Sequence, residues 1–116
     1  MRSESLKGHL DALILAIVSG GPQHGYAIIE ELRCRSGGAM TLPEGTVYPA
    51  LHRLEASGLL SSSWSLQAGR RRRVYELTRR GVRELGARRD EWREFASAVE
   101  AVLAPGDPSG PRVVPA

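Results

Sequence analysis

Apolar residues recur with helical spacing through the first part of the chain. Leucine, isoleucine and valine fall at steps of three and four over residues 6–18, and a Gly-Gly-Pro run follows them. This pattern predicts a buried helix over about residues 6–19, because an apolar stripe ended by glycine and proline is typical of a helix packed on a core. The same signals predict a second helix over 25–35, which ends before Gly37-Gly38.

Pro49 restricts where a third helix can begin. Proline has no amide hydrogen, and only the first four amides of a helix lack an internal partner. We therefore expect the helix to start near Gly45 or Thr46, with Thr46 as its cap. Thr41 and Glu44 also match a capping box, which would start the helix earlier and leave the proline too deep. The apolar face consists of Val47, Leu51 and Leu54, and Gly58 is the expected stop.

After this helix the spacing changes to that of a β-strand. The alternation predicts two strands joined by a hairpin loop at Gln67-Ala68-Gly69. A two-stranded ribbon is unstable alone, so we expect it to lie against the helices. The residues expected to share a face are Leu60, Trp64 and Leu66 on the first strand, and Tyr75 and Leu77 on the second.

A long amphipathic helix is predicted next, capped by Thr78 and extending to about Leu103. Its apolar residues alternate in steps of three and four, as in a coiled-coil seam that Arg89 interrupts. At 1.5 Å per residue this helix is about 37 Å long, which is more than a small body can bury. The seam consists of Val82, Leu85, Trp92, Ala96, Val99 and Leu103.

The order helix, helix, helix, hairpin is that of a winged helix-turn-helix module. The predicted fold class is therefore mainly α with a small β-hairpin wing, extended by a long C-terminal dimerisation helix. We expect a winged helix-turn-helix DNA-binding domain over residues 1–78 and the dimerisation helix over 79–104. The tail over 105–116, which holds four prolines and two glycines, is expected to be disordered.

The positive charge lies in the second part of the chain. Residues 1–69 hold five basic and six acidic side chains, whereas residues 70–116 hold eleven basic and seven acidic ones. Six arginines fall between Arg70 and Arg80. A small basic protein with clustered cations suggests an anionic partner, most often nucleic acid.

Several classes of protein are excluded or disfavoured by what the sequence contains. One cysteine, Cys34, and three scattered histidines give neither a disulfide framework nor a thiolate zinc cage, and Cys34 is interpreted as a small apolar filler. We find no phosphate-binding glycine loop and no nucleophile with a partner base, so an enzyme, a metal site and a cofactor are not expected. Without a signal peptide or spanning segment, a cytoplasmic protein with no membrane contact is expected. A protein-binding winged helix remains the alternative function.

Four motifs, in this order and spacing, resemble the PadR family of bacterial transcriptional regulators in its short form with one C-terminal helix. They are His24-Gly25-Tyr26, the run from Leu42 to Leu51, Arg53-Leu54-Glu55 with Gly58-Leu59, and Arg70 to Arg73 followed by Tyr75-Glu76-Leu77-Thr78. The resemblance covers about residues 6–103. It implies a homodimer that binds palindromic promoter DNA, usually as a repressor, and releases it when a small molecule binds.

A winged helix places its third helix in the major groove of DNA. Gly45 would allow the backbone to approach closely, and Thr46 and Tyr48 would offer hydroxyl contacts. His52, one turn further on, could reach a base edge. The alternatives are that Thr46 is only a cap, that Tyr48 is a core aromatic, and that His52 is a solvated surface side chain.

Two further segments are candidate DNA contacts. The second helix opens with His24, Gly25 and Tyr26, and the free amides at its start favour a phosphate. The alternative is that Gly25 permits a tight turn and that Tyr26 packs beneath the wing. The wing carries four consecutive arginines that suit a phosphate track or a narrow minor groove. On a strand they alternate between faces. We expect Arg71 and Arg73 to share a face with Tyr75, and Arg70 and Arg72 to lie on the opposite face.

The long helix is expected to pair with its symmetry mate and with the first helix of the partner. The expected dimer interface consists of Leu6, Leu10, Leu85, Trp92, Ala96, Val99 and Leu103. The resemblance also implies that a planar hydrophobic or phenolic effector can lie between dimer-related tryptophans. The candidate ligand contacts are Trp92, Phe95 and Ala96, although an aromatic residue on such a seam is more often core.

Overall fold

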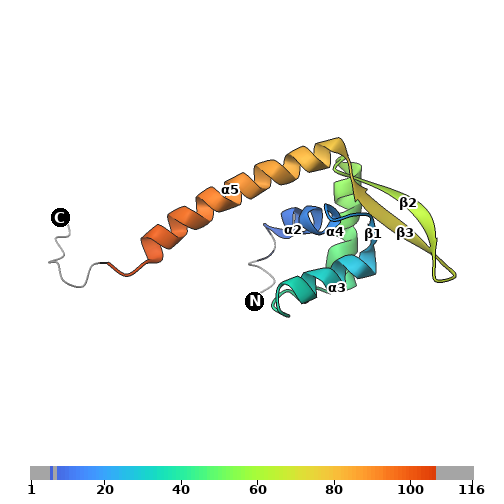
Figure 1. Ribbon diagram of the computed structural model, residues 1–116, viewed down its shortest axis with the longest axis horizontal. Helices are drawn as coiled ribbons and strands as arrows, with labels where there is room; N and C mark the ends of the chain where they lie inside the picture. The colour runs from blue at the N-terminus through green and yellow to red at the C-terminus, as the bar shows by residue number, and fades with distance from the viewer. Residues whose placement is uncertain (1–5, 7, 107–116) are drawn as a thin grey trace.

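A body of packed helices carries a small antiparallel sheet on one side and a long helical arm on the other (Figure 1). This computed structural model describes residue 6 and residues 8–106. The predicted fold class, mainly α with a β wing, is confirmed. The elements are α2 (Leu10–Val18), β1 (Gln23–His24), α3 (Gly25–Arg35), α4 (Glu44–Ala56), β2 (Leu60–Gln67), β3 (Arg70–Leu77) and α5 (Arg79–Leu103). The predicted disordered tail lies, from residue 107 on, outside the described residues.

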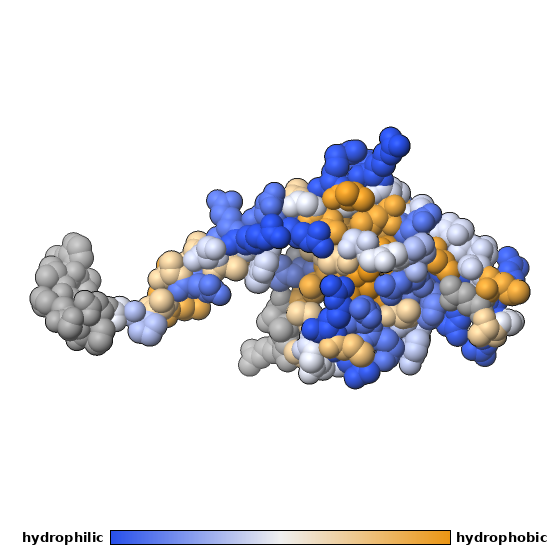
Figure 2. All heavy atoms as spheres, in the orientation of Figure 1, coloured by the Kyte–Doolittle hydropathy of each residue, from blue (hydrophilic) through white to orange (hydrophobic). Residues whose placement is uncertain are grey.

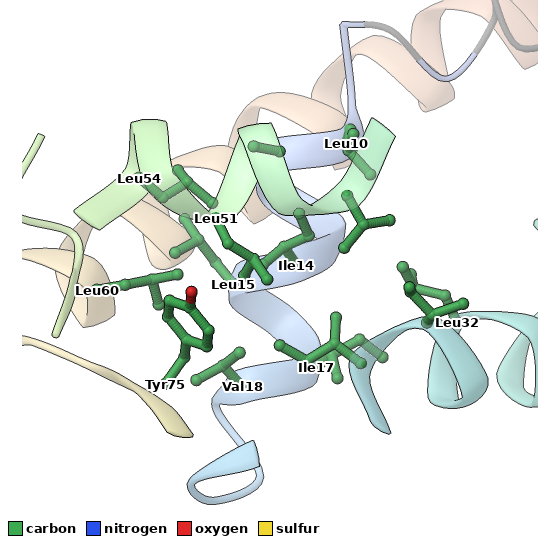
Figure 3. Close-up of a cluster of buried hydrophobic side chains, with 14 of the residues drawn as sticks. Leu10, Ile14, Leu15, Ile17, Val18, Leu32, Leu51, Leu54, Leu60 and Tyr75 are labelled. Atoms are coloured by element: carbon green, nitrogen blue, oxygen red, sulfur yellow. The ribbon is translucent and has the colours of Figure 1, made fainter. Parts of the chain in front are cut away.

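The hydrophobic core forms where the three body helices meet the base of the sheet (Figure 3). Ile14 of α2, Ile28 of α3 and Leu51 of α4 are fully buried. Leu60 of β2 and Tyr75 of β3 join the same cluster. The apolar faces predicted for the helices are therefore the faces that pack, and burial of these side chains holds the sheet against the body.

The first predicted helix is shorter than expected. Gly8 and His9 form a turn, and α2 begins only at Leu10. Glycine is a poor residue for a helix interior because it loses more backbone entropy than other residues, which explains an interruption at this position.

The prediction that Thr46 caps the third helix is wrong. The helix begins at Glu44, and Pro43 occupies the cap position without a side-chain hydrogen bond. Pro49 is thus the sixth helical residue, where it deprives the carbonyl of Gly45 of its helical partner. Because Gly45 is exposed, water can satisfy that carbonyl. The capping box does not form either, since Thr41 donates its hydroxyl to the carbonyl of Gly38.

The wing is a three-stranded antiparallel sheet in the order β1-β3-β2. Its hairpin turn contains only Ala68 and Gly69, both with positive φ, because Gln67 still pairs with Arg70. Two successive positive φ values match the twist of a tight hairpin. The short strand β1 was not predicted; it pairs with β3 and so attaches the start of α3 to the wing.

The arm, α5, begins as predicted at Thr78. The Thr78 hydroxyl accepts a hydrogen bond from the amide of Gly81 and donates one to the carbonyl of Gly58. Gly81 and Leu85 are the residues of α5 that are buried. Beyond them the helix leaves the body (Figure 1), and apolar surface reappears at its far end (Figure 2). None of the helices in the described part of the chain has the length and apolar character needed to cross a bilayer.

Candidate nucleic-acid interface

Helix α4 has a solvent-facing stripe opposite its core face. Gly45, Pro49, His52 and Ala56 follow one another at steps of four, three and four, and all are exposed. The stripe carries little side-chain bulk near its start, so another macromolecule can approach the backbone closely there. His52 is the polar side chain on it. Thr46 is also exposed, but it lies on the flank that faces α2.

Tyr48 connects α4 to the start of α3. Its side chain is half-buried and packs against the core cluster. A Cβ atom added to Gly25 would lie 2.6 Å from Cε1 of the Tyr48 ring, so this contact requires glycine at position 25. The ring therefore packs between α4 and the start of α3.

His24 caps α3 with its imidazole ring. Nδ1 accepts a hydrogen bond of 3.2 Å from the amide of Ala27. Burial, and then the positive charge of Arg72, lower the pKa of His24. A neutral ring that accepts at Nδ1 carries its hydrogen on Nε2, which leaves one donor for an anionic group. Next to it, Tyr26 is 51% exposed and is not covered by the wing.

The two faces of the wing differ in chemistry. In an antiparallel pair, residues directly opposite each other project on the same side. The register pairs Ser63 with Val74 and Ser65 with Arg72 on one face, and it places His24 beside Val74 on that face. This serine–arginine face carries Ser61, Ser63, Ser65, Arg70 and Arg72, together with Val74 and Glu76 near its base. Hydroxyl and guanidinium groups are the side chains that commonly bind phosphate.

The opposite face holds an exposed tryptophan between two arginines. Arg71 and Arg73 place their guanidinium carbons 5.1 and 5.5 Å from the centroid of Trp64. Arg73 also donates to Ser62 Oγ and lies 3.6 Å from the carboxylate of Glu55. By contrast, Arg70, Arg71 and Arg72 form no ion pair with any residue that the structure describes.

The predicted DNA-contact residues are thus brought together in part. The start of α3 and the serine–arginine face are joined through the pairing of β1 with β3. Tyr48 and Arg73, in contrast, are engaged within the chain. The sequence analysis did not predict that Glu55, Ser62 and Trp64 contact the wing arginines Arg71 and Arg73. The alternation along each strand predicts which face Trp64 and Arg73 lie on. It does not predict the register between the strands, which places Trp64 opposite Arg73.

The residues predicted for the dimer interface and for the ligand contacts divide into two groups. Leu6, Leu10 and Leu85 are buried in the core of their own chain, so little of their surface is available to a partner. Trp92 and Phe95 are more than half exposed, and Trp92 contacts the His9 ring edge-on with centroids 5.1 Å apart. A shallow apolar patch, the distal patch, is lined by Phe95, Ala98, Val99, Val102 and Leu103. Ala96 is half-buried beside it.

Comparison with known proteins gives consistent matches over most of the chain. Residues 14–87 match the model of the transcriptional regulator PadR-like family. Transcriptional regulator Rv3488 of Mycobacterium tuberculosis is 42% identical over 76 residues, which cover 66% of this chain and 68% of the relative. An uncharacterized protein of Lysinibacillus sphaericus is 28% identical over 104 residues, which cover 89% of this chain and 95% of the relative.

Solved structures agree with these sequence matches. A PadR-like transcriptional regulator of Bacillus cereus superposes with a TM-score of 0.80 at 27% identity, covering 90% of this chain and 100% of the other. A PadR family transcriptional regulator of Eggerthella lenta gives 0.77 at 29% identity, covering 89% and 88% of the two chains. Since the family model spans well over half of its residues, this chain belongs to the PadR-like family of transcriptional regulators.

Proposed function

We propose that this PadR-family regulator is a cytoplasmic homodimer that binds a palindromic site in double-stranded promoter DNA. It acts as a repressor, and a planar hydrophobic or phenolic molecule relieves the repression. The observation that carries the proposal is the combination of the exposed stripe on α4 with three wing arginines that form no ion pair in the described part of the chain.

The exposed stripe of α4 enters the major groove in this proposal. Gly45 lets the helix backbone approach the bases, Thr46 contacts DNA from the flank, and His52 reaches a base edge. Tyr48 supports the helix from behind and can offer only its hydroxyl, because its ring packs on Gly25. Base contacts from α4 would provide sequence specificity.

The wing and the start of α3 contact the phosphate backbone. Arg70, Arg71 and Arg72 are exposed or half-exposed cations that can neutralise phosphates and release condensed counterions. His24 offers its Nε2 hydrogen, and Tyr26 its exposed hydroxyl, at the neighbouring position. These contacts would fix the register of the protein on the duplex rather than read its sequence.

The arm supplies the dimer and the effector site. Its distal patch is apolar and projects away from the body, and an apolar helix face of this kind is stabilised when a second copy covers it. Trp92, Phe95 and Ala96 lie at the body end of this patch, where two copies would enclose aromatic surface for a flat ligand.

The proposal is tested by protection mapping on the DNA upstream of the gene that encodes this protein. We expect two protected half-sites whose centres lie about 34 Å apart, one turn of duplex, because each subunit presents one α4. Adding candidate hydrophobic or phenolic compounds should abolish the protection. A protein that remains monomeric and binds all duplex sequences equally at physiological salt would contradict the proposal, because nonspecific affinity is a property of any basic protein.

A further inference from the structure

Side-chain contacts connect the last turn of α4 to strands β2 and β3 of the wing. Glu55 lies one residue before the end of α4, and its carboxylate accepts a hydrogen bond from Ser62 Oγ of β2. Arg73 of β3 donates from Nε to Ser62 Oγ at 2.8 Å, and its terminal nitrogen lies 3.6 Å from the Glu55 carboxylate. Glu55, Ser62 and Arg73 are called the Glu55 triad below.

The ring of Trp64 extends these contacts toward the tip of the wing. It lies under the guanidinium of Arg73 on the body side and under that of Arg71 on the tip side. A cation within about 6 Å of an aromatic centroid is attracted to the ring. The register puts Trp64 opposite Arg73 and Leu66 opposite Arg71, so these side chains occupy one face.

The outer wing has little else to hold it in place. Trp64 and Leu66 are 57% and 72% exposed, whereas Leu60 and Tyr75, at the base of the same face, are almost fully buried. The triad therefore lies where burial ends. A two-stranded ribbon without an apolar face in contact with the body is only marginally stable, so its inclination depends on contacts of this kind.

We propose that Glu55 and Arg73 are positioning residues, which hold the wing at a fixed inclination to α4 so that both elements meet one duplex together. The inference rests on the proposed DNA binding, and it separates Arg73 from the three arginines that precede it. Elements that are already held at their bound separation lose less conformational entropy on binding. Arg73 would thus contribute to affinity without contacting a phosphate.

Substitution of Glu55 separates positioning from simple electrostatics by the sign of its effect. Glu55→Gln removes a negative charge close to the DNA-binding surface, and electrostatics alone would then tighten binding to polyanionic DNA. If Glu55 positions the wing, the variant binds its specific site more weakly, by roughly three- to tenfold, which lies in the lower part of the range of coupling between contacting residues. Affinity is measured by fluorescence anisotropy on the mapped site over a series of salt concentrations.

Arg73→Gln is compared with Arg72→Gln, which makes the same change of charge on the opposite face. We expect Arg72→Gln to lower the slope of log affinity against log salt by about 0.9, as for one lost phosphate contact. Arg73→Gln should weaken binding and leave that slope unchanged. The double variant Glu55→Gln/Arg73→Gln should bind no more weakly than either single variant, because both remove the same contact.

Hydrogen exchange in the free protein provides a measurement that does not need DNA. Glu55→Gln should speed amide exchange in residues 64–71, whereas Arg72→Gln should not. Equal or tighter DNA binding by Glu55→Gln, a slope for Arg73→Gln that falls as it does for Arg72→Gln, or unchanged exchange would each overturn the inference. If the wild-type protein shows no sequence preference, the proposed function is contradicted instead. The exchange data would still show whether Glu55 holds the wing in place.

Discussion

His24 connects the start of α3 to the wing. It caps α3 through Nδ1, pairs with Val74 of the wing, and lies close enough to Arg72 for that charge to lower its pKa. Protonation of the ring would remove the acceptor that the helix uses and would add a positive charge beside the arginine. The neutral ring is therefore the form that this local structure requires.

Acidification should destabilise the protein through His24. The pKa of His24 in the folded chain lies below its ordinary value of 6.5. The unfolded chain then binds more protons, so this contribution to stability is complete above pH 6.5 and decreases as the pH falls through the folded pKa. We expect the urea midpoint of the wild type to fall more between pH 7.5 and pH 5.5 than that of His24→Asn, which keeps a capping side chain without the charge. Parallel decreases in the two proteins would contradict this assignment.

Caps show how much of the residue scale can be predicted from the sequence. Thr78 was identified correctly, because an apolar helical series begins just after it and the preceding residues alternate as a strand. Thr46 was not, because the rule that excludes proline from a helix interior assumed that the carbonyl of Gly45 needed an amide partner. Gly45 is exposed, so water can take the place of the missing amide partner. A local sequence pattern predicts a helix cap well only where water cannot replace a missing hydrogen-bond partner of the backbone.

At the scale of elements, α5 contains two glycines in opposite environments. A Cβ atom added to Gly81 would lie 2.1 Å from the carbonyl oxygen of Leu59, a backbone atom that cannot rotate away. A Cβ added to Gly86 would meet nothing within 4 Å. The close approach at Gly81 lets the first turn of the arm pack against the chain between α4 and β2.

Alanine at these two positions should therefore change stability in opposite directions. Gly81→Ala must displace the start of α5 and should lower the free energy of unfolding by about 3 kcal/mol. Gly86→Ala should raise it by about 1 kcal/mol, because alanine is the better helix former at an open site. Urea denaturation of both variants measures the difference. If Gly81→Ala is as stable as Gly86→Ala, the described packing of the arm is incorrect.

Element boundaries show where sequence reasoning ends. The helices and the hairpin were predicted because each has its own apolar period, whereas β1 has two residues and no period. Its existence depends on β3, some fifty residues later in the chain, lying next to it. The contact of Glu55 with Arg73 was missed for the same reason, since it depends on how the wing leaves α4 rather than on either local sequence.

At the scale of the whole molecule, the far end of the arm exposes apolar surface that the body does not cover. Phe95, Val102 and Leu103 are 59%, 83% and 76% exposed, and they lie on one side of α5 with Val99. Exposed apolar residues that repeat at helical spacing form one continuous surface, and such a surface is typical of a site where a partner helix packs.

A charge placed on the distal patch should separate the subunits of the proposed dimer. Val99→Glu should yield a folded monomer that binds the palindromic site roughly 100-fold more weakly or worse, because the second half-site is no longer bound by a linked subunit. Ser97→Glu adds the same charge on the other side of α5 and should remain dimeric. Sedimentation equilibrium and anisotropy measure the two effects; a dimeric Val99→Glu protein would remove the patch from the interface.

The joint between wing and arm consists of one residue, Thr78, which is also hydrogen bonded to Gly58 and Leu59 just beyond α4. The wing, the arm and the end of α4 thus share a single pivot. Because the arm is about 37 Å long, a tilt of about 5° at this pivot displaces its tip by about 3 Å. In the proposed dimer, a small change in how the two arms cross would therefore alter the separation of the two α4 helices, and the packing of Leu85 in the core would have to adjust with it.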